Sequence, residues 1–266
     1  MSTQLVEDVK VKVMEAVQTP VRRTATAREI RYGWRRRIGM LLPSVNRVAE
    51  PEVTALMPDG VSLHTTRLKL TGSSREDLLA MTEKVEEGAA LLGDAGVDLI
   101  VFHCTAVTTM DANMEASLVK RVEKASGKPA TATSAALLSA LHTLGANKIV
   151  LLTPYPRDSN EREVAFLAHH KIMVVREAGM EITEGAKMGL VEPGDWYRYA
   201  QAHRHDEADA YFLSCTAIRA MPIIEALESD LGKPVITSNQ AMAWHVLRSV
   251  GVRDAIQGYG TLLSRF

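Results

Sequence analysis

The sequence predicts an α/β fold of two pseudo-symmetric lobes, each a parallel four-stranded sheet flanked by helices, facing each other across a cleft. Two observations predict it. Short apolar runs alternate with helix-like segments, the pattern of parallel sheets with right-handed crossovers. A repeat also divides the chain, because Arg37-Ile-Gly-Met-Leu-Leu-Pro43 aligns with Lys148-Ile-Val-Leu-Leu-Thr-Pro154 at an offset of 111 positions, and Gly127-Lys128-Pro129 recurs as Gly232-Lys233-Pro234.

The first half of the repeat predicts four strands separated by three helices. Its strands are apolar runs, and Leu99-Ile-Val-Phe102 is apolar throughout, which suits a strand covered on both faces. The expected order is strand 38–42, helix 48–57, strand 61–68, helix 74–94, strand 98–103, helix 112–125 and strand 129–132.

The second half repeats this alternation. The expected order is strand 148–153, helix 159–170, strand 172–177, helix 194–206, strand 209–214, helix 217–230 and strand 234–237. A helix-like segment that ends near a glycine follows the last strand of each half, at 134–145 and 239–251. Residues 1–32 are rich in charge and stand apart from the repeat, so we expect an N-terminal extension.

The composition describes a globular protein and excludes several classes of partner. Hydrophobic residues make up 46% of the 266 residues, so a packed core is expected. The net charge of −1 gives no electrostatic reason for a nucleic-acid or membrane partner. No apolar run approaches the length of a membrane span, and two cysteines make no disulfide framework. We therefore expect a cytoplasmic protein with reduced thiols.

The only two cysteines occupy matching places in the repeat. Cys104 follows an apolar strand in His103-Cys-Thr-Ala106, and Cys215 follows one in Ser214-Cys-Thr-Ala217, 111 positions later. Free cysteine is commonly a small buried hydrophobe, but the duplicated setting favours thiol chemistry. Each cysteine precedes an expected helix start, whose free N–H groups favour a thiolate or a bound carboxylate.

Other candidates lie at the same edges of the sheets, where ligands of open α/β sheets bind. Ser44 and Asn46 follow the first strand of the first half, and Tyr155 follows the matching strand. Amide and phenol donors can hold a carboxylate, although asparagine also favours turns for backbone reasons. Asn239 opens the last long helix, either as its cap or in contact with the pocket. His103 should face away from its neighbouring thiol, so we interpret it as structural.

Metal and nucleotide signatures are missing from the sequence. The histidine pairs His169-His170 and His203-Arg-His205 lack partners at zinc-site spacing. There is no phosphate-binding glycine motif and no Gly-x-Ser-x-Gly. These observations predict no metal site and disfavour nucleotide-binding and hydrolase interpretations.

Five short motifs belong together: Pro43-Ser-Val-Asn46 with Glu50-Pro-Glu52, His103-Cys-Thr105, Thr153-Pro-Tyr155, Ser214-Cys-Thr216 and Ser238-Asn-Gln-Ala241. With them the chain resembles the aspartate/glutamate racemase superfamily, and within it the maleate isomerase and arylmalonate decarboxylase group, over about residues 36–260. The resemblance implies that the final helix crosses back to the first lobe. The expected division is an extension at 1–32, a first lobe at 33–132 completed by 238–266, and a second lobe at 133–237.

The resemblance also implies an activity without metal or organic cofactor. In maleate isomerases the cysteine matching Cys104 adds to the double bond, and the one matching Cys215 serves as acid or base. The implied substrate is a small carboxylic acid, and a homodimer or larger homo-oligomer is expected. The residues expected to bind the substrate are Ser44, Asn46, Thr105, Ala106, Tyr155, Thr216 and Asn239.

Three alternatives stay open from the sequence. A racemase of amino acids or hydantoins would use both thiols on opposite faces of one carbon. The second alternative is an arylmalonate-type decarboxylase. The decarboxylases that this chain resembles keep only the thiol matching Cys215 and place a hydroxyl where this chain has Ala106. Arg47, beside Asn46, and His103 also depart from the expected pattern. These departures allow a non-catalytic carboxylate-binding protein as well.

Overall fold

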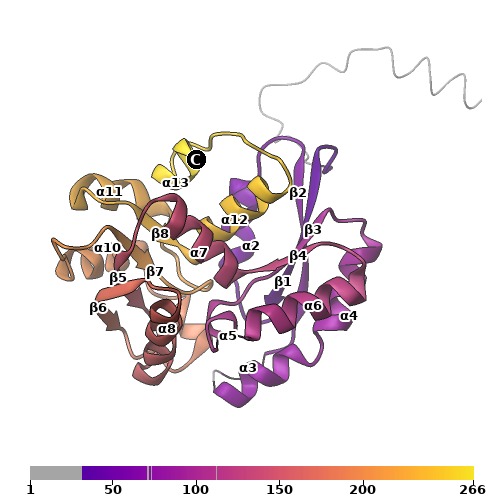
Figure 1. The fold of residues 1–266 in the computed structure, drawn as a ribbon, viewed down its shortest axis with the longest axis horizontal. Helices are drawn as coiled ribbons and strands as arrows, with labels where there is room; N and C mark the ends of the chain where they lie inside the picture. The colour runs from indigo at the N-terminus through magenta and orange to yellow at the C-terminus, as the bar shows by residue number, and fades with distance from the viewer. Residues whose placement is uncertain (1–31, 71, 73, 112) are drawn as a thin grey trace, which may run out of the picture. The chain divides into compact units, whose positions relative to one another are not determined.

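The computed structural model describes residues 32–70, 72, 74–111 and 113–266. The described chain forms two parallel four-stranded sheets of the same topology, ordered β2-β1-β3-β4 and β6-β5-β7-β8 (Figure 1). Their strands are β1 Arg36–Pro43, β2 Val61–Leu68, β3 Leu99–Phe102 and β4 Ala130–Ala132, then β5 Lys148–Thr153, β6 Met173–Gly179, β7 Ala210–Leu213 and β8 Val235–Thr237. The predicted fold class is confirmed.

The central strands of both sheets are buried on both faces, as their apolar sequences predict. All four residues of β3 and all four of β7 are buried. The helices that precede β5 in the chain are α2 Ala49–Leu56, α3 Arg75–Thr82, α4 Val85–Asp94, α5 Thr105–Thr108, α6 Met114–Ser126 and α7 Thr133–Thr143. The later ones are α8 Arg157–His169, α9 Gly185–Met188, α10 Pro193–Ala202, the 3₁₀-helix η1 Met221–Ile223, α11 Ile224–Leu231, α12 Ser238–Ser249 and α13 Thr261–Arg265.

Two predicted helices are corrected. The segment 74–94 is not one helix but two, since α3 ends at Thr82 and α4 begins at Val85. At the break the Thr82 carbonyl accepts a hydrogen bond from Arg121 Nη2 at 2.7 Å. The segment 217–230 is helical only from the η1 turn at Met221 onward. Proline at position 222 explains this, since proline inside a helix removes an N–H donor and clashes with the preceding turn. Residues directly after Cys215 therefore form a turn.

Helix α12 connects the two halves. It contacts α2 and α7 of the first half (Figure 1), and Thr237 caps it in a capping box with Gln240. The segment after α12 contacts both halves, because Asp254 pairs with Arg35 and Thr261 bonds Glu228. The division of the chain at residues 132 and 237 thus stays a prediction, and the predicted extension lies outside the described residues except for its last residue.

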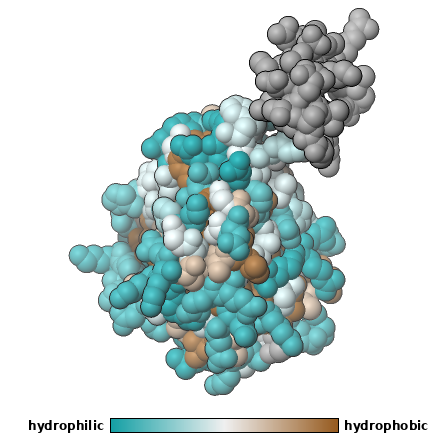
Figure 2. Space-filling model, turned by 90° about the vertical axis from the view of Figure 1, so that its right-hand side faces the viewer, coloured by the Kyte–Doolittle hydropathy of each residue, from teal (hydrophilic) through white to brown (hydrophobic). Residues whose placement is uncertain are grey.

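The surface fits the nearly neutral composition. The face in Figure 2 is largely hydrophilic, with apolar side chains in small scattered groups. Within the described part of the chain, every helix is too short or too polar to cross a lipid bilayer.

Candidate active site

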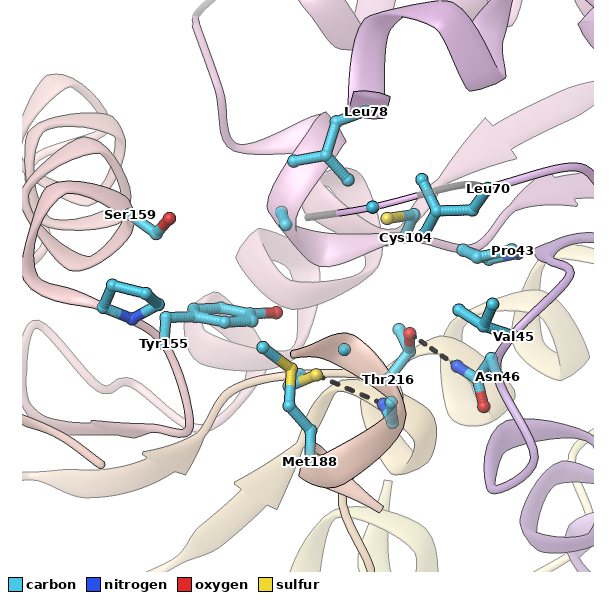
Figure 3. Close-up of a pocket in the computed structure, with 16 residues that line it drawn as sticks. Pro43, Val45, Asn46, Leu70, Leu78, Cys104, Tyr155, Ser159, Met188 and Thr216 are labelled. Atoms are coloured by element: carbon cyan, nitrogen blue, oxygen red, sulfur yellow. Dashed lines mark hydrogen bonds between the residues drawn. The ribbon is translucent and has the colours of Figure 1, made fainter. Parts of the chain in front are cut away.

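One cavity is lined by residues from both sheets. The empty space within it, together with the solvent at its open mouth, amounts to about 630 Å³. Cys104 and the Tyr155 phenol point into it from opposite sides (Figure 3). Six of the nine residues selected from the sequence line it: Asn46, Cys104, Ala106, Tyr155, Cys215 and Thr216.

The other three selected residues lie outside the lining. Ser44 Oγ accepts the backbone N–H of Leu70 at 3.0 Å, and Thr105 Oγ1 donates to Ser238 Oγ at 2.9 Å. The Asn239 side chain is buried behind the cysteines. The polar atoms of these three residues are engaged within the protein.

Cys104 follows β3 and is the N-cap residue of the four-residue helix α5. The N–H groups of Val107 and Ala106 approach its sulfur and favour the thiolate, but burial outweighs them and raises the pKa of the Cys104 thiol to about 12. The N–H groups of the helix start thus favour a thiolate, as expected from the sequence, but their effect on the pKa of Cys104 is smaller than that of burial. The thiol bears its proton at neutral pH.

Cys215 follows β7 in a different backbone setting. No helix begins there, and its φ of 135° lies in a region that residues with a side chain rarely adopt. The conformation is held by two hydrogen bonds: its N–H donates to Ser238 Oγ at 3.1 Å, and its sulfur accepts from the N–H of Ala217 at 3.3 Å. Strain of this kind, of order 1–3 kcal/mol, concentrates at functional sites.

Tyr155 is the side-chain donor that acts on Cys215. Burial raises the pKa of the Cys215 thiol to about 11, whereas a hydrogen bond from Tyr155 acts in the opposite direction. Burial likewise holds the pKa of the Tyr155 phenol well above its usual value, and the charges of Cys215 and Glu163 add to the effect. The phenol is thus a neutral donor that points into the cavity.

Asn46 combines the two roles that the sequence left open. Its Oδ1 accepts the backbone N–H groups of Val48 and Ala49 at 2.9 and 3.0 Å, as in a turn that starts a helix. Its Nδ2 donates to Thr216 Oγ1 at 2.9 Å (Figure 3). Asn46 therefore joins the loop after β1 to the loop that carries Cys215.

A buried network behind the cavity was missed in the sequence. Asn239 Nδ2 donates to Glu52 Oε2 at 2.6 Å and to the Thr216 carbonyl at 3.2 Å, so its Oδ1 accepts from His103 Nε2 at 2.9 Å. Burial lowers the pKa of His103 to about 4, which makes it neutral. This network fits a structural His103, whereas the interpretation of Asn239 as the helix cap is wrong because Thr237 is the cap.

Much of the cavity wall is apolar, and its residues were not predicted from the sequence. Val45, Leu70, Leu78 and Met188 line it, and Figure 3 shows Leu78 and Met188 on opposite sides. These residues come from loops and helices far apart in the chain, and nothing in their local sequence marks them. In the described residues no group of three His, Cys, Asp or Glu side chains could hold a metal ion.

Two similar α/β lobes with one cysteine from each at a shared cavity define a site of the aspartate/glutamate racemase type. Comparison with known families makes this specific: the chain belongs to the arylmalonate decarboxylase family, which matches residues 38–263.

Curated relatives include two kinds of enzyme. A maleate isomerase of Nocardia farcinica is 28% identical over 239 residues, which cover 86% of this chain and 95% of that protein. An arylmalonate decarboxylase of Bordetella bronchiseptica is 28% identical over 229 residues, covering 85% of this chain and 95% of that protein.

Solved structures give the same two groups. The maleate isomerase Iso from Pseudomonas putida S16 has a TM-score of 0.82 at 25% identity, covering 86% of this chain and 98% of that one. A mutant of the Nocardia farcinica maleate cis-trans isomerase with a covalently bound succinylcysteine intermediate has a TM-score of 0.83 at 27% identity, covering 87% and 99%. Unliganded arylmalonate decarboxylase has a TM-score of 0.74 at 27% identity, covering 87% and 100%.

Proposed function

We propose that this protein is a cofactor-independent isomerase that converts maleate, or a closely related cis-enedioate, to its trans isomer. The observation that carries the proposal is the placement of Cys104 and Cys215 at equivalent strand ends, lining one cavity. The maleate isomerase relatives support it, and so does the succinylcysteine adduct described for one of them.

The reaction follows from the positions of the two thiols. The Cys104 thiol gives up its proton to a carboxylate of the bound substrate, which holds it until Cys104 leaves again. The Cys104 sulfur adds to one olefinic carbon, and Cys215 donates its proton to the other. The product is a thioether in which the former double bond is a carbon–carbon single bond. That bond rotates. The Cys215 thiolate then removes the proton, the C–S bond breaks, and the trans double bond forms as the Cys104 thiolate leaves. Because the sulfur and the proton are both returned, no oxidant or reductant is consumed.

The substrate carboxylates meet uncharged donors in this proposal. Tyr155 offers its phenol, Asn46 its second amide hydrogen, and Thr216 its hydroxyl, while the N–H of Ala106 lies beside the Cys104 sulfur. Buried neutral donors of fixed orientation can stabilise developing negative charge without reorganising.

Three of the residues selected from the sequence act by positioning in this proposal. They are Ser44, Thr105 and Asn239, whose polar atoms bond within the protein.

Proton NMR of the purified protein with maleate tests the proposal. We expect the olefinic signal of maleate to be replaced by that of fumarate without added metal or cofactor. Hydrogen exchange at the α-carbon of an amino acid, without olefin change, would instead support a racemase. No change in maleate over hours at high protein concentration would contradict the proposal.

Decarboxylation of an arylmalonate is the second candidate. The apolar wall formed by Val45, Leu70, Leu78 and Met188 suits an aryl group, and the Bordetella bronchiseptica relative is a decarboxylase. The thiol at Cys104 is the feature against it, because decarboxylation needs only one proton donor. Carbon dioxide release from phenylmalonate would favour this candidate.

Arg47 leads to a prediction about substrate length. It makes no hydrogen bond or ion pair with any described residue, and it lines a second hollow that shares Val45, Gly185 and Ala217 with the main cavity. We expect Arg47→Gln to raise KM about fivefold for a six-carbon cis-enedioate, about 1 kcal/mol for an exposed ion pair, and to leave KM for maleate unchanged.

Steady-state kinetics with both acids measure this effect, with Arg204→Gln, outside both hollows, as the control. An equal change in KM for both acids would show that Arg47 does not select by length.

Assembly and location are further predictions. A homodimer or larger homo-oligomer follows from the resemblance, and size-exclusion chromatography with light scattering tests it. A cytoplasmic location and a small carboxylic acid as the only partner class are consistent with the net charge of −1.

A further inference from the structure

One polar residue of the cavity wall was not selected from the sequence. Ser159 is the third residue of α8, whose first residue is Arg157, and it lines the cavity together with Tyr155. Figure 3 shows the hydroxyl groups of these two residues on one side of the cavity, whereas Thr216 and Asn46 lie on the opposite side. The cavity therefore has hydroxyl groups on two sides.

The oxygen of the Ser159 hydroxyl already has a partner within the protein. Ser159 Oγ accepts a hydrogen bond from Arg162 Nη2 at 2.9 Å, and Arg162 Nη1 donates to Asp158 Oδ2 at 3.0 Å. A serine hydroxyl also has one hydrogen to donate, and that of Ser159 donates to no described residue, a carbonyl of its own helix included. The hydrogen is thus left for a group in the cavity.

Thr216 has the same arrangement on the other side of the cavity. Its Oγ1 accepts from Asn46 Nδ2 at 2.9 Å, and its own hydroxyl hydrogen donates to no residue that the structure describes. In both places a nitrogen donor of the protein holds the hydroxyl oxygen and leaves the hydrogen available. A ligand with a hydrogen-bond acceptor at each end fits this pair of donors.

The charge of the wall indicates which acceptor this is. The described residues that line the cavity are all uncharged side chains, so a carboxylate held there depends on hydrogen-bond donors. An ionised carboxylate is an acceptor only, and hydrogen bonds to it are about twice as strong as those between neutral groups. The Tyr155 phenol donates to Cys215, so Ser159 supplies the uncommitted donor on that side.

We propose that Ser159 is a substrate-binding residue whose hydroxyl donates to one carboxylate of a cis-enedioate, while the other carboxylate is held on the side of Thr216 and Asn46. Arg162 is the positioning residue that keeps the Ser159 hydroxyl turned toward the cavity. The assignment rests on the function proposed above, because it takes the substrate to be a diacid, and it adds the partner of the second carboxylate.

Binding of succinate tests the assignment without turnover, because succinate has two carboxylates but no double bond to which a thiol could add. We expect Ser159→Ala to raise the Kd of succinate about tenfold, as for the loss of one hydrogen bond to a charged group. A titration followed by ligand-observed proton NMR measures the Kd. Alanine is the better helix former, so the variant should fold, and Ser159→Thr, which keeps a hydroxyl, should bind succinate like the unaltered protein.

Butyrate is the matched control ligand, since it has a methyl group in place of one carboxylate of succinate. Its single carboxylate can be held on the Thr216 side, so its Kd should be the same in Ser159→Ala and in the unaltered protein. Ser117→Ala, at an exposed position of α6, is the matched control variant and should leave succinate binding unchanged. Unchanged succinate binding in Ser159→Ala would overturn the proposal, and so would an equal weakening of succinate and butyrate.

A double-mutant cycle tests the role of Arg162. Arg162→Leu should raise the Kd of succinate about threefold, because the Ser159 hydroxyl is then free to turn to a carbonyl of its own helix. In Ser159→Ala the same change should have no effect, since the two residues act through one hydrogen bond. An ionic strength of about 1 M limits the direct attraction between the guanidinium and the anion to about 3 Å. Additive effects would overturn the positioning role.

The outcomes of this test and of the isomerase assay are separate. A protein that binds succinate through Ser159 but leaves maleate unchanged would contradict the isomerase and support this binding site. Conversion of maleate to fumarate, with succinate binding unaffected by Ser159→Ala, would support the isomerase and overturn this assignment.

Discussion

Replacing Cys104 by alanine is expected to abolish the conversion of maleate to fumarate, lowering kcat by about 10⁴-fold or more, because rotation about the carbon–carbon bond requires a bond from sulfur to carbon. Proton NMR of the olefinic signals measures the loss. The side chain lines the cavity, and the change removes a single sulfur atom from its wall, so we expect a small change in thermal unfolding. A variant that kept a tenth of the wild-type rate would contradict the addition mechanism.

The same variant separates the two enzyme classes of the family. With Cys104 removed, Cys215 remains as the single thiol, the arrangement that the resemblance attributes to arylmalonate decarboxylases. Phenylmalonate should then be the informative substrate. If decarboxylation persists in Cys104→Ala at the rate of the unaltered protein while isomerisation is lost, the decarboxylase is an independent activity of this cavity.

Replacing Cys215 by serine is expected to lower turnover by about 10³-fold and to leave a covalent adduct on Cys104. Water can supply the proton that completes the adduct in place of Cys215, but a neutral serine hydroxyl is a poor base, so the step that removes the proton from the thioether fails. Intact-protein mass spectrometry after incubation with maleate should show a gain of one maleate. Peptide mapping should place it on Cys104.

The double variant Cys104→Ala with Cys215→Ser is the control, and it should gain no mass. Turnover by Cys215→Ser at the wild-type rate would rule out the two-thiol mechanism. An adduct located on a residue other than Cys104 would reverse the proposed roles.

The architecture was predictable because its determinants are local. Fully apolar runs such as Leu99–Phe102 mark strands buried on both faces, and the 111-residue repeat doubles every such signal. The loops after β1 and β3 must be adjacent because these strands pair in parallel, with Leu41 opposite Phe102. The convergence of Asn46 and Cys104 on one edge therefore followed from strand order alone.

The features that were not predicted depend on contacts between residues that are distant in the sequence. Arg121 bonds the Thr82 carbonyl at the break in the segment 74–94, and Asn239 bonds both Glu52 and His103. No local pattern marks such pairs. The turn after Cys215 was different, since the proline at position 222 was a readable signal that a helix could not run through from 217.

The start of α12 carries a consequence for how a ligand reaches the cavity. Ser238 Oγ accepts from both Thr105 Oγ1 and the N–H of Cys215, and the next residue bonds His103 and the Thr216 carbonyl. Each cysteine loop is thereby bonded to the start of α12 by two hydrogen bonds, so the two loops cannot move apart without breaking at least two of them. Admission and release of a ligand are then expected at parts of the wall that these bonds do not hold, such as Leu78 on α3 and Met188 on α9, which line the cavity.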